Sequence, residues 1–243
     1  MMRHLSSQVV KVKIQRPFDS FIIWEIALEF KKPKRYQVSA TEDFEPDSDG
    51  QVLSNYLGVK SKEKMDLIEE QELERADFEL SKIFSADHTF TAQDICNIHE
   101  FWLGNIYLFA GKYRTLTLSK DGFMFAAPNM IPALIEKLER SYLKKYTPCL
   151  NMELEKLAHA MSIVHVELIL IHPFREGNGR TARLLANLMC LQANQPLLNF
   201  AGIYQTKNPS GFEKYIKAIH AGFNENYEPI QDIFVKLIKS SII

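Results

Sequence analysis

The sequence predicts a mainly α-helical protein, folded as one helical bundle with a single small β-hairpin. Three observations carry this prediction. Apolar residues recur at the helical period in most segments, capping residues stand at the starts of those segments, and only one segment combines strand-like alternation with a tight turn. Residues 161–171 are apolar on all sides, which is typical of a helix at the centre of a bundle.

The first two predicted helices begin at strong capping signals. Ser61 can accept a backbone N–H at the start of a helix that runs to about Phe84. Thr91 and Asp94 have the spacing of a capping box, at the start of a helix that continues through Trp102. Local polar chemistry therefore places both helix starts.

The later helices follow from proline position and apolar period. Pro132 suits the first turn of a helix, and Asn151 is expected to cap the long helix that ends near Ile171. The same period extends over three more segments, residues 178–194, 209–222 and 229–240. We expect all of these helices to share one core.

The hairpin is predicted within residues 112–126. Alternating side chains form its first half, Tyr113, Arg114, Thr115, Leu116, Thr117 and Leu118. Asp121-Gly122 then offers a tight turn before Phe123. We expect two antiparallel strands on either side of this turn.

The composition excludes several classes of protein. The 243 residues contain 29 Lys and Arg against 30 Asp and Glu, and a formal net charge of −1 argues against a general nucleic-acid binder. The three cysteines lack metal-ligand spacing and are expected to be reduced thiols. The most apolar run, residues 161–171, is shorter than the roughly 20 residues of a membrane span. With no apolar signal-peptide core at the start, we expect a soluble, cytoplasmic protein, with export to a host cell left open.

Residues 1–45 differ from the rest of the chain and are expected to be an N-terminal extension of uncertain fold. Residues 1–35 are locally basic, with weak strand-like alternation around Val10 and Val12. Residues 41–50 are acidic and rich in turn formers. The basic stretch is either a contact surface for an anionic partner or, as is commoner, a solvated face.

Residues 171–183, IHPFREGNGRTAR, carry the chemistry of the chain. Pro173 ends a buried helix, and Gly177 and Gly179 bracket Asn178 where the next helix begins. A helix N-terminus offers unpaired N–H groups and the positive end of the dipole, which suits an anion such as phosphate. The two glycines allow phosphate oxygens to approach the backbone closely.

The same segment supplies charged and titratable groups. Arg180 and Arg183 are three residues apart on one helical face, where both can reach a polyphosphate. Glu176 is a suitable oxygen ligand for Mg²⁺, and His172 is suited to accept a proton near pH 7. Each feature alone is commoner in a structural role, as a helix cap, a turn or a solvated face. Together they indicate an enzyme that acts on a nucleoside triphosphate.

The motif resembles that of the Fic family. HPFREGNGRTAR fits HxFx(D/E)GNGRxxR at every specified position. AGKYRTLTLSKDGFMFAAP is similar to the flap that precedes the motif in Fic proteins, and LSNYLGV and NYEPIQDIF are similar to flanking elements. The resemblance implies a Fic-like helical bundle with a hairpin flap before the motif. It places a Fic domain at residues 46–243, with a core at about 90–237.

The resemblance implies a protein adenylyltransferase, which moves AMP from ATP to a Ser, Thr or Tyr hydroxyl and releases pyrophosphate. By position in the motif, His172 would be the general base and Glu176 would hold Mg²⁺. Phe174 would pack into the core. The remaining motif residues would bind the phosphates, Gly177, Asn178 and Gly179 at the α and β groups and Arg180 and Arg183 at the β and γ groups.

The flap would dock a segment of the target protein by strand addition, a mode that fixes a hydroxyl without demanding a sequence. Its predicted docking residues are Thr115, Leu116, Thr117, Gly122 and Phe123. The target protein is the expected partner, and the resemblance leaves open an inhibitory partner protein and a homodimer. Two alternatives stay open: a Fic-fold transferase of another phosphate-containing group, or a non-catalytic module that binds nucleotide or nucleic acid.

Many Fic proteins carry an inhibitory helix of pattern (S/T)xxxE(G/N), whose Glu pairs with the second motif arginine. TEDFEP, containing Glu45, ends in Pro, and AGFNEN, containing Glu225, begins with Ala, so neither fits cleanly. We therefore expect Arg183 to be unpaired in the free chain, with inhibition supplied by a second protein or absent.

Overall fold

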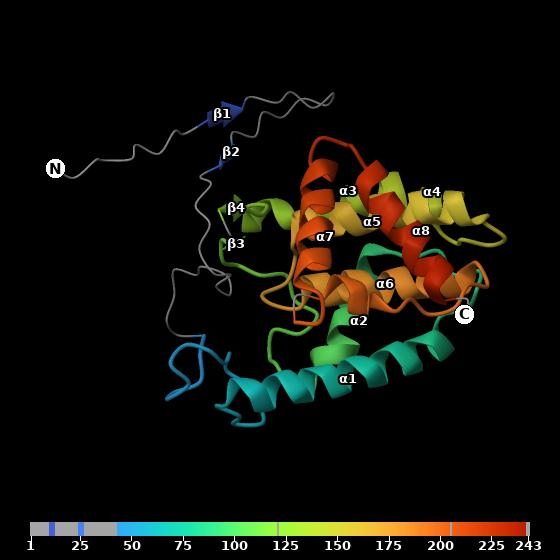
Figure 1. Ribbon diagram of the computed structural model, residues 1–243. Coiled ribbons are helices and arrows are strands. Elements are labelled where there is room, and N and C mark those ends of the chain that lie inside the picture. Colours follow the sequence, from blue (N-terminus) through green and yellow to red (C-terminus); the bar gives the residue numbers. More distant parts are fainter. Residues whose placement is uncertain (1–9, 13–23, 27–42, 121, 205, 242–243) are drawn as a thin grey trace.

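The computed structural model describes residues 10–12, 24–26, 43–120, 122–204 and 206–241 (Figure 1). Within the N-terminal extension it contains two short strands, β1 (Val10–Val12) and β2 (Trp24–Ile26), which pair antiparallel with Lys11 opposite Glu25. The predicted strand-like stretch near Val10 is therefore a strand. The rest of the basic segment lies outside the described residues.

The described part of the chain is mainly helical, as predicted. Helix α5 is at its centre: most of its residues are buried, and it packs against α3, α6, α7 and α8. Helices α1 and α2 pack on each other and on α6 (Figure 1). The helix bounds are α1 Lys62–Ile83, α2 Ala92–Leu103, α3 Ile131–Leu138, α4 Lys144–Tyr146, α5 Leu154–Ile171, α6 Asn178–Gln192, α7 Pro209–Gly222 and α8 Glu228–Ser241.

The predicted helix starts at Ser61 and Thr91 are confirmed. The Ser61 hydroxyl accepts a hydrogen bond from the backbone of Lys64 at 3.2 Å. Thr91 and Asp94 form the full capping box, each side chain bonded to the backbone N–H of the other residue. The three predicted segments after the motif become α6, α7 and α8, with ends within two residues of the prediction.

The predicted cap at Asn151 is wrong. Helix α5 begins at Leu154 after Glu153, and Asn151 lies before it in the left-handed region, with φ of 53°. Asn tolerates this conformation better than most residues and favours turns. Asn151 therefore forms a turn before α5 and does not cap it.

The connection between α2 and α5 contains shorter turns of helix. A 3₁₀ turn (Pro128–Met130) leads into α3, in which Pro132 occupies the first turn as predicted. A π-helical turn (Glu139–Leu143) then joins α3 to α4. A further 3₁₀ turn (Phe200–Ile203) precedes α7.

The hairpin is present but shorter than predicted. Strands β3 (Ser119–Lys120) and β4 (Phe123–Met124) pair antiparallel, and the Phe125 N–H donates to the Leu118 carbonyl at 3.1 Å. The preceding residues do not join this sheet. The Arg114 N–H instead donates to the carbonyl of Pro173 at 2.8 Å, which commits this stretch to the motif loop.

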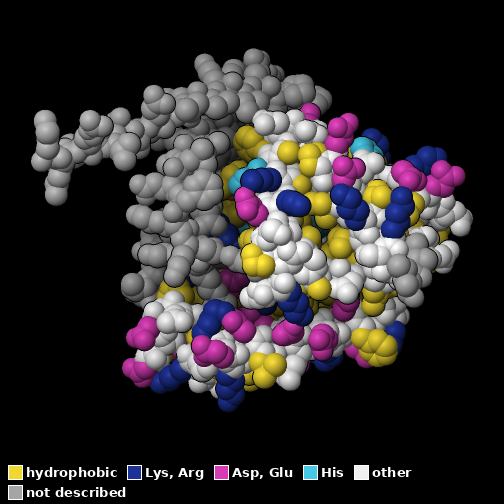
Figure 2. Space-filling view, in the orientation of Figure 1, with side chains coloured by type: hydrophobic (Ala, Val, Ile, Leu, Met, Phe, Trp, Pro, Cys, Tyr) yellow, Lys and Arg dark blue, Asp and Glu magenta, His cyan; other side chains and the backbone are white. Residues whose placement is uncertain are grey.

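The described surface and interior match an ordinary globular protein. Figure 2 shows acidic and basic side chains interspersed over α1, at the bottom of the view. Cys96, Cys149 and Cys190 are buried free thiols. No described helix combines the length and the apolar character needed to cross a membrane.

Candidate active site

The motif loop joins the C-terminus of α5 to the N-terminus of α6. His172 caps α5 in the left-handed conformation, with φ of 53°. Gly177 caps α6, also left-handed, with φ of 81°. The loop between them thus connects the end of the central helix to the exposed N–H groups of a new first turn. His172 and the N-terminus of α6 therefore lie at the two ends of one short loop.

The two glycines meet different surroundings. A Cβ on Gly177 would lie 2.7 Å from Cζ3 of Trp102 on α2, closer than a Cβ can approach. A Cβ on Gly179 would meet only Nη1 of Arg183, at 3.8 Å. Gly177 therefore fits the loop against α2, whereas Gly179 faces open space where a phosphate can approach.

The side chain of Asn178 closes the loop. Its Oδ1 accepts from the Phe174 N–H and its Nδ2 donates to the Phe174 carbonyl, both at 2.8 Å. Asn178 is 1% exposed. Its amide is therefore occupied within the loop, and the group it can offer to a phosphate is its backbone N–H.

His172 is held as a neutral imidazole of defined tautomer. Its Nδ1 lies 3.0 Å from the Ile169 carbonyl, which can only accept, so Nδ1 carries the proton and Nε2 is the basic nitrogen. The ring stacks on Phe125 at a centroid distance of 3.6 Å and is 4% exposed. Burial, with smaller contributions from the charges of Arg114 and Lys120, lowers the pKa of His172 to about 3. The ring is thus in its basic form at neutral pH.

Arg114 is a buried residue that contacts the motif loop and was not among the predicted site residues. It is 4% exposed, and its Nε donates to the His172 carbonyl at 2.7 Å. Its Nη atoms donate to the carbonyls of Leu116 and Ala126, both at 2.6 Å. One guanidinium therefore joins both sides of the flap to the motif loop. The signal in the sequence is its position on the inward side of the predicted alternation, where a charge is unusual.

Phe174 packs in the core as predicted, and its partner is His99 of α2, a second missed residue. The two rings stack at 3.8 Å. His99 accepts from the Gly111 N–H at Nδ1 and donates from Nε2 to the Glu176 carbonyl, at 2.8 and 3.0 Å. Burial lowers the pKa of His99 to about 4. This histidine, on the apolar face of α2, fixes the backbone of the predicted metal ligand.

Glu176 and Arg180 lie together with a third missed residue, Glu69 of α1. Oε1 of Glu176 accepts from the Gly177 N–H at 3.0 Å and lies 3.6 Å from Nη2 of Arg180. Nη1 of Arg180 is closer to Oε2 of Glu69, at 2.7 Å. The guanidinium also lies over the Trp102 ring, 4.5 Å from its centroid.

Arg183 projects toward α7 and the segment before it. Its guanidinium lies 4.8 Å from the ring centroid of Tyr204 and hydrogen-bonds with Tyr215. Tyr215 in turn donates to Nε2 of the buried His165 at 2.7 Å. The Nε of Arg183 is buried and has no hydrogen-bond partner among the described residues. The sequence predicts an unpaired Arg183; in the described structure it hydrogen-bonds with Tyr215, and neither Glu45 nor Glu225 is among its partners.

The residues present are compatible with Mg²⁺ bound together with a nucleotide. In the described part of the chain, no three His, Cys, Asp or Glu side chains converge on a metal position. Mg²⁺ commonly binds through one or two carboxylates plus substrate phosphates. Glu176, beside the N-terminus of α6, is a carboxylate of this kind, and the phosphates would supply the remaining ligands.

The flap contacts α7 through its aromatic side chains. Phe123 stacks on His220 at 5.1 Å and meets Phe223 edge-on at 6.1 Å. Thr115, Thr117 and Gly122 are exposed, and Leu116 is half-buried. The predicted docking residues therefore divide, with Phe123 facing the protein and the others lining an accessible edge.

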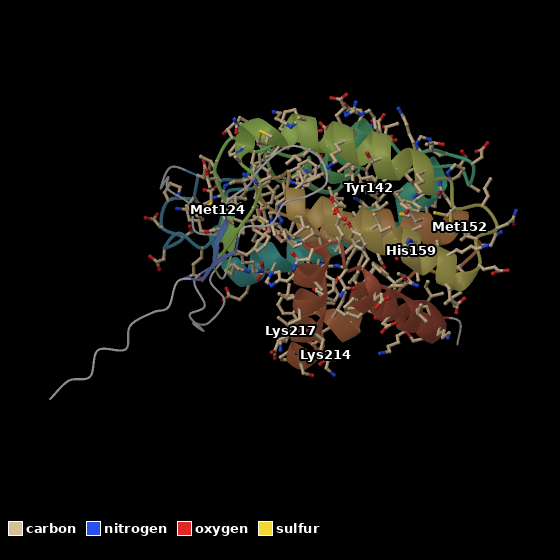
Figure 3. All side chains as sticks on the ribbon, turned by 90° about the horizontal axis from the view of Figure 1, so that it is seen from above. Met124, Tyr142, Met152, His159, Lys214 and Lys217 are labelled. Carbon is tan, nitrogen blue, oxygen red and sulfur yellow. The ribbon has the colours of Figure 1, made fainter. Side chains whose placement is uncertain are left out.

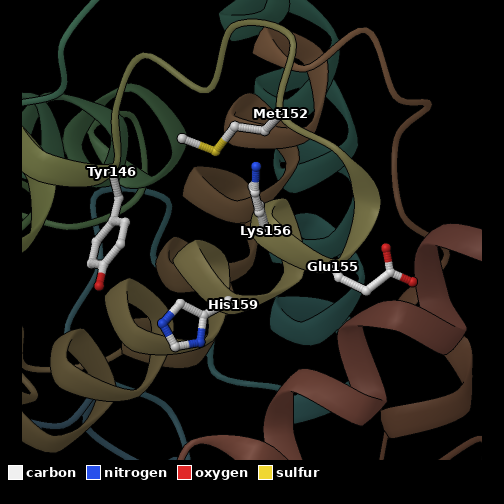
Figure 4. A pocket seen from close by; sticks show the side chains of 5 residues that line it. All are labelled: Tyr146, Met152, Glu155, Lys156 and His159. Atoms are coloured by element: carbon white, nitrogen blue, oxygen red, sulfur yellow. The ribbon is translucent and has the colours of Figure 1, made fainter.

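A cavity of about 380 Å³ lies far from this site. It is lined by Tyr146, Met152, Glu155, Lys156 and His159 (Figure 4). His159 precedes His172 by 13 residues on one helix, roughly 20 Å at 1.5 Å per residue. Figure 3 shows Met152 and His159 at the opposite end of the molecule from Met124 of the flap. We assign this cavity no part in the chemistry.

The site can be compared with known proteins. Residues 89–190 match the model of the Fic/DOC family. The protein adenylyltransferase VbhT of Bartonella schoenbuchensis is 29% identical over 132 residues, 54% of this chain and 27% of VbhT. The chain thus matches about a quarter of that relative's length.

Solved structures share the fold. The N-terminal Fic domain of a putative cell filamentation protein from Bartonella quintana, with bound ADP, has a TM-score of 0.63 at 23% identity, covering 80% of this chain and 93% of that one. The BepC protein of Bartonella tribocorum, with bound AMPPNP, has a TM-score of 0.60 at 19% identity, covering 76% and 91%. The overall helical fold is therefore shared with these Fic domains.

Proposed function

Since this chain carries a domain of the Fic/DOC family, we propose that it is a protein adenylyltransferase. It would move AMP from ATP to a Ser, Thr or Tyr hydroxyl of a target protein and release pyrophosphate. Relatives named as protein adenylyltransferases support the reaction, and related domains with bound ADP and AMPPNP support the nucleotide. The observation that carries the proposal is one buried loop with His172 at its start and the N-terminus of α6 at its end.

His172 would act as the general base. Its Nε2 takes the proton from the target hydroxyl while the hydroxyl oxygen forms a bond to the α-phosphorus of ATP. The bond from that phosphorus to the pyrophosphate oxygen breaks, and pyrophosphate leaves with the electron pair. A pKa of about 3 keeps the ring unprotonated at neutral pH. Negative charge from bound phosphates would raise this pKa, so the base strengthens when nucleotide is present. General-base catalysis contributes roughly 10²–10⁴-fold to the rate.

The first turn of α6 would bind the phosphates. Its backbone N–H groups lack intrahelical acceptors, and Gly179 leaves their face open. Arg180 and Arg183 would add charge on the same side, each held by residues of other helices. Fixed donors of this kind stabilise charge that develops on the transferred phosphorus without having to reorganise during the reaction.

Glu176 would hold the Mg²⁺ that accompanies ATP. Mg²⁺ supplies positive charge to the phosphate oxygens and orients the leaving group. Within the chain, the Gly177 N–H and the His99 contact at the Glu176 carbonyl fix both ends of this residue.

The flap would orient the target. The segment around Thr115 and Thr117 is exposed and outside the β3–β4 ladder, so its backbone can pair with an incoming strand. Arg114 anchors this segment to His172. The anchor would bring a docked hydroxyl to a fixed distance from the base.

Incubation with ATP labelled at either the α- or the γ-phosphate tests the proposal. With Mg²⁺ and a cell lysate as target source, α-label should stay on protein and γ-label should leave as pyrophosphate. Retention of γ-label alone would indicate phosphotransfer. The test is run once with a lysate of the chain's own cell and once with a lysate of a host cell. If neither label stays on protein in either lysate, a non-catalytic module is favoured.

His172→Ala is the decisive variant, with His159→Ala as its matched control. His159 is on the same helix but exposed, bonded to Gln231 and far from the loop. The His172 variant should bind Mg·ATP and lose most transfer, while the His159 variant should keep both. Transfer by His172→Ala at a comparable rate would exclude this base.

A further inference from the structure

We propose that Glu69 of α1 is a positioning residue of the nucleotide site, which holds Arg180 toward the phosphates and away from Glu176. Helix α1 precedes the residues that match the family model. The inference rests on the proposed function for the identity of the nucleotide, ATP with Mg²⁺.

Glu69 is fully buried and fully engaged. Its exposed fraction is 0%. Oε1 accepts a hydrogen bond from the Tyr107 hydroxyl, and Oε2 lies 2.7 Å from Nη1 of Arg180. Its backbone carbonyl accepts from Nε1 of Trp102 at 3.0 Å. A carboxylate with this many fixed partners has little freedom to move, so it can define where the arginine lies.

Arg180 is shared between two carboxylates at unequal distances. Glu69 is at 2.7 Å and Glu176 at 3.6 Å. Two carboxylates and one guanidinium leave a net charge of about −1, which is available to a cation at Glu176. If Glu69 were neutral, Arg180 and Glu176 would form a pair with no net charge. Such a pair would withdraw Arg180 from the phosphates and Glu176 from Mg²⁺ at the same time.

The face of Trp102 completes the arrangement. The Arg180 guanidinium lies 4.5 Å from the ring centroid, and Gly177 packs against the edge of the same ring. Trp102 also donates to Glu69. One indole therefore contacts the buried carboxylate, the arginine and the loop glycine, so that α1 and α2 together fix the geometry of the cradle.

An inhibitory role for Glu69 predicts the opposite effect of its removal. A carboxylate that blocked the phosphate site would have to leave when ATP binds. Glu69 lies beneath Tyr107 and Trp102 with no exposed surface, which favours a permanent support. The residues at the fixed positions of the inhibitory pattern also differ, since Met65 replaces Ser or Thr and Glu70 replaces Gly or Asn.

The test compares Glu69→Gln with Asp77→Asn, a matched control on the same helix. Asp77 also reaches from α1 to α6, where both of its oxygens accept from Nδ2 of Asn187 at 2.9 Å. ATP binding is measured by calorimetry with and without Mg²⁺, together with the thermal midpoint. Glu69→Gln should weaken Mg²⁺-free ATP binding by roughly three- to tenfold and reduce the gain in affinity that Mg²⁺ gives the wild type. Asp77→Asn should change the midpoint and leave both affinities within twofold.

A double-mutant cycle with Glu176→Gln separates positioning from general damage. If Glu69 acts by keeping Arg180 from Glu176, Glu69→Gln should have little further effect on Mg²⁺ dependence once Glu176 is neutral. Additive effects, or a Glu69→Gln variant that loses stability but keeps wild-type affinities, would overturn the inference. A rise in transfer would instead identify an inhibitory contact and overturn it as well.

Two provisions keep the result interpretable. If Glu69→Gln does not fold, Glu69→Asp is the second variant, with the same charge on a side chain one methylene shorter. It should change both ATP affinities in the same direction but by smaller factors. Unchanged affinities in that variant would count against the proposal. A wild-type chain that binds Mg·ATP but transfers no AMP would refute the proposed function and still allow the role of Glu69 to be measured.

Discussion

Alanine at Gly177 should lower the stability of the fold, whereas alanine at Gly179 should leave stability unchanged and weaken ATP binding. At Gly177 the backbone has φ of 81°, and a Cβ would lie 2.7 Å from Trp102. The left-handed conformation costs a residue with a Cβ about 1–2 kcal/mol, and overpacking of a core adds about 1–3 kcal/mol. Gly177→Ala should therefore lower the free energy of unfolding by about 2–5 kcal/mol. For a chain of this size, each kcal/mol shifts the melting temperature by about 2–4 °C.

Gly179→Ala is the internal control for this reasoning. Its Cβ would have only the end of the Arg183 side chain within 4 Å, at 3.8 Å, and its φ is not positive. The melting temperature should stay the same or rise slightly, since Ala is favoured over Gly in a helix. The added methyl would occupy the face where a phosphate approaches, so ATP affinity should fall at least tenfold.

Thermal denaturation and calorimetry on the same two proteins decide the matter. We expect Gly177→Ala to melt well below the wild type and Gly179→Ala to melt with it but bind ATP poorly. Equal melting temperatures for the two variants would refute the account of Gly177. Full ATP affinity in Gly179→Ala would show that phosphate does not approach this face.

Three more predictions follow from the described contacts. Burial lowers the pKa of His172 to about 3 and that of His99 to about 4, below the ordinary 6.5. The free energy of unfolding should therefore fall as the pH drops from about 6.5 toward 4. Urea titrations should show a shallower fall for His99→Gln than for the wild type. Arg114→Lys keeps the charge but loses the branched guanidinium that bonds to both the flap and the loop. The kcat should fall at least tenfold while ATP affinity stays within threefold of the wild type. An unchanged kcat would show that Arg114 does not position the site. Glu45→Gly and Glu225→Gly should each leave the rate of AMP transfer within twofold of the wild type. Glu45 accepts a hydrogen bond from the Asn55 N–H at 2.7 Å, and Glu225 lies exposed after α7. A tenfold rise in the rate of either variant would reveal internal inhibition.

The helices were predictable where local chemistry decides their ends. Ser61 and Thr91 cap the helices that follow because their side chains bond to the backbone within three residues, a range that the sequence specifies directly. Asn151 shows the limit of this rule. The same side chain favours both a cap and a left-handed turn, and at Asn151 the backbone adopts the left-handed turn.

The motif itself was predictable because its residues are contiguous, whereas its supports are not. Glu69, His99 and Arg114 approach the loop from segments between 58 and more than 100 residues away. Arg114 has a local signal in its place on the inward side of the alternation, but the sequence around Glu69 does not distinguish a buried charge from an exposed one. Arg114 also shortened the hairpin, because its backbone N–H pairs with Pro173 and not with a strand. Such tertiary competition is invisible to a pattern of alternation.

In the proposed reaction, the stack of Phe125 on His172 would affect what happens to ATP when no target is present. An imidazole that is 4% exposed, covered on one face by an aromatic ring at 3.6 Å, leaves little space for solvent. Water is small, abundant and a competing nucleophile for the same phosphorus. Shielding the imidazole until a protein segment docks would spare the nucleotide from hydrolysis. Discrimination between a protein hydroxyl and water would then arise from access to the base and not from differences in their chemistry.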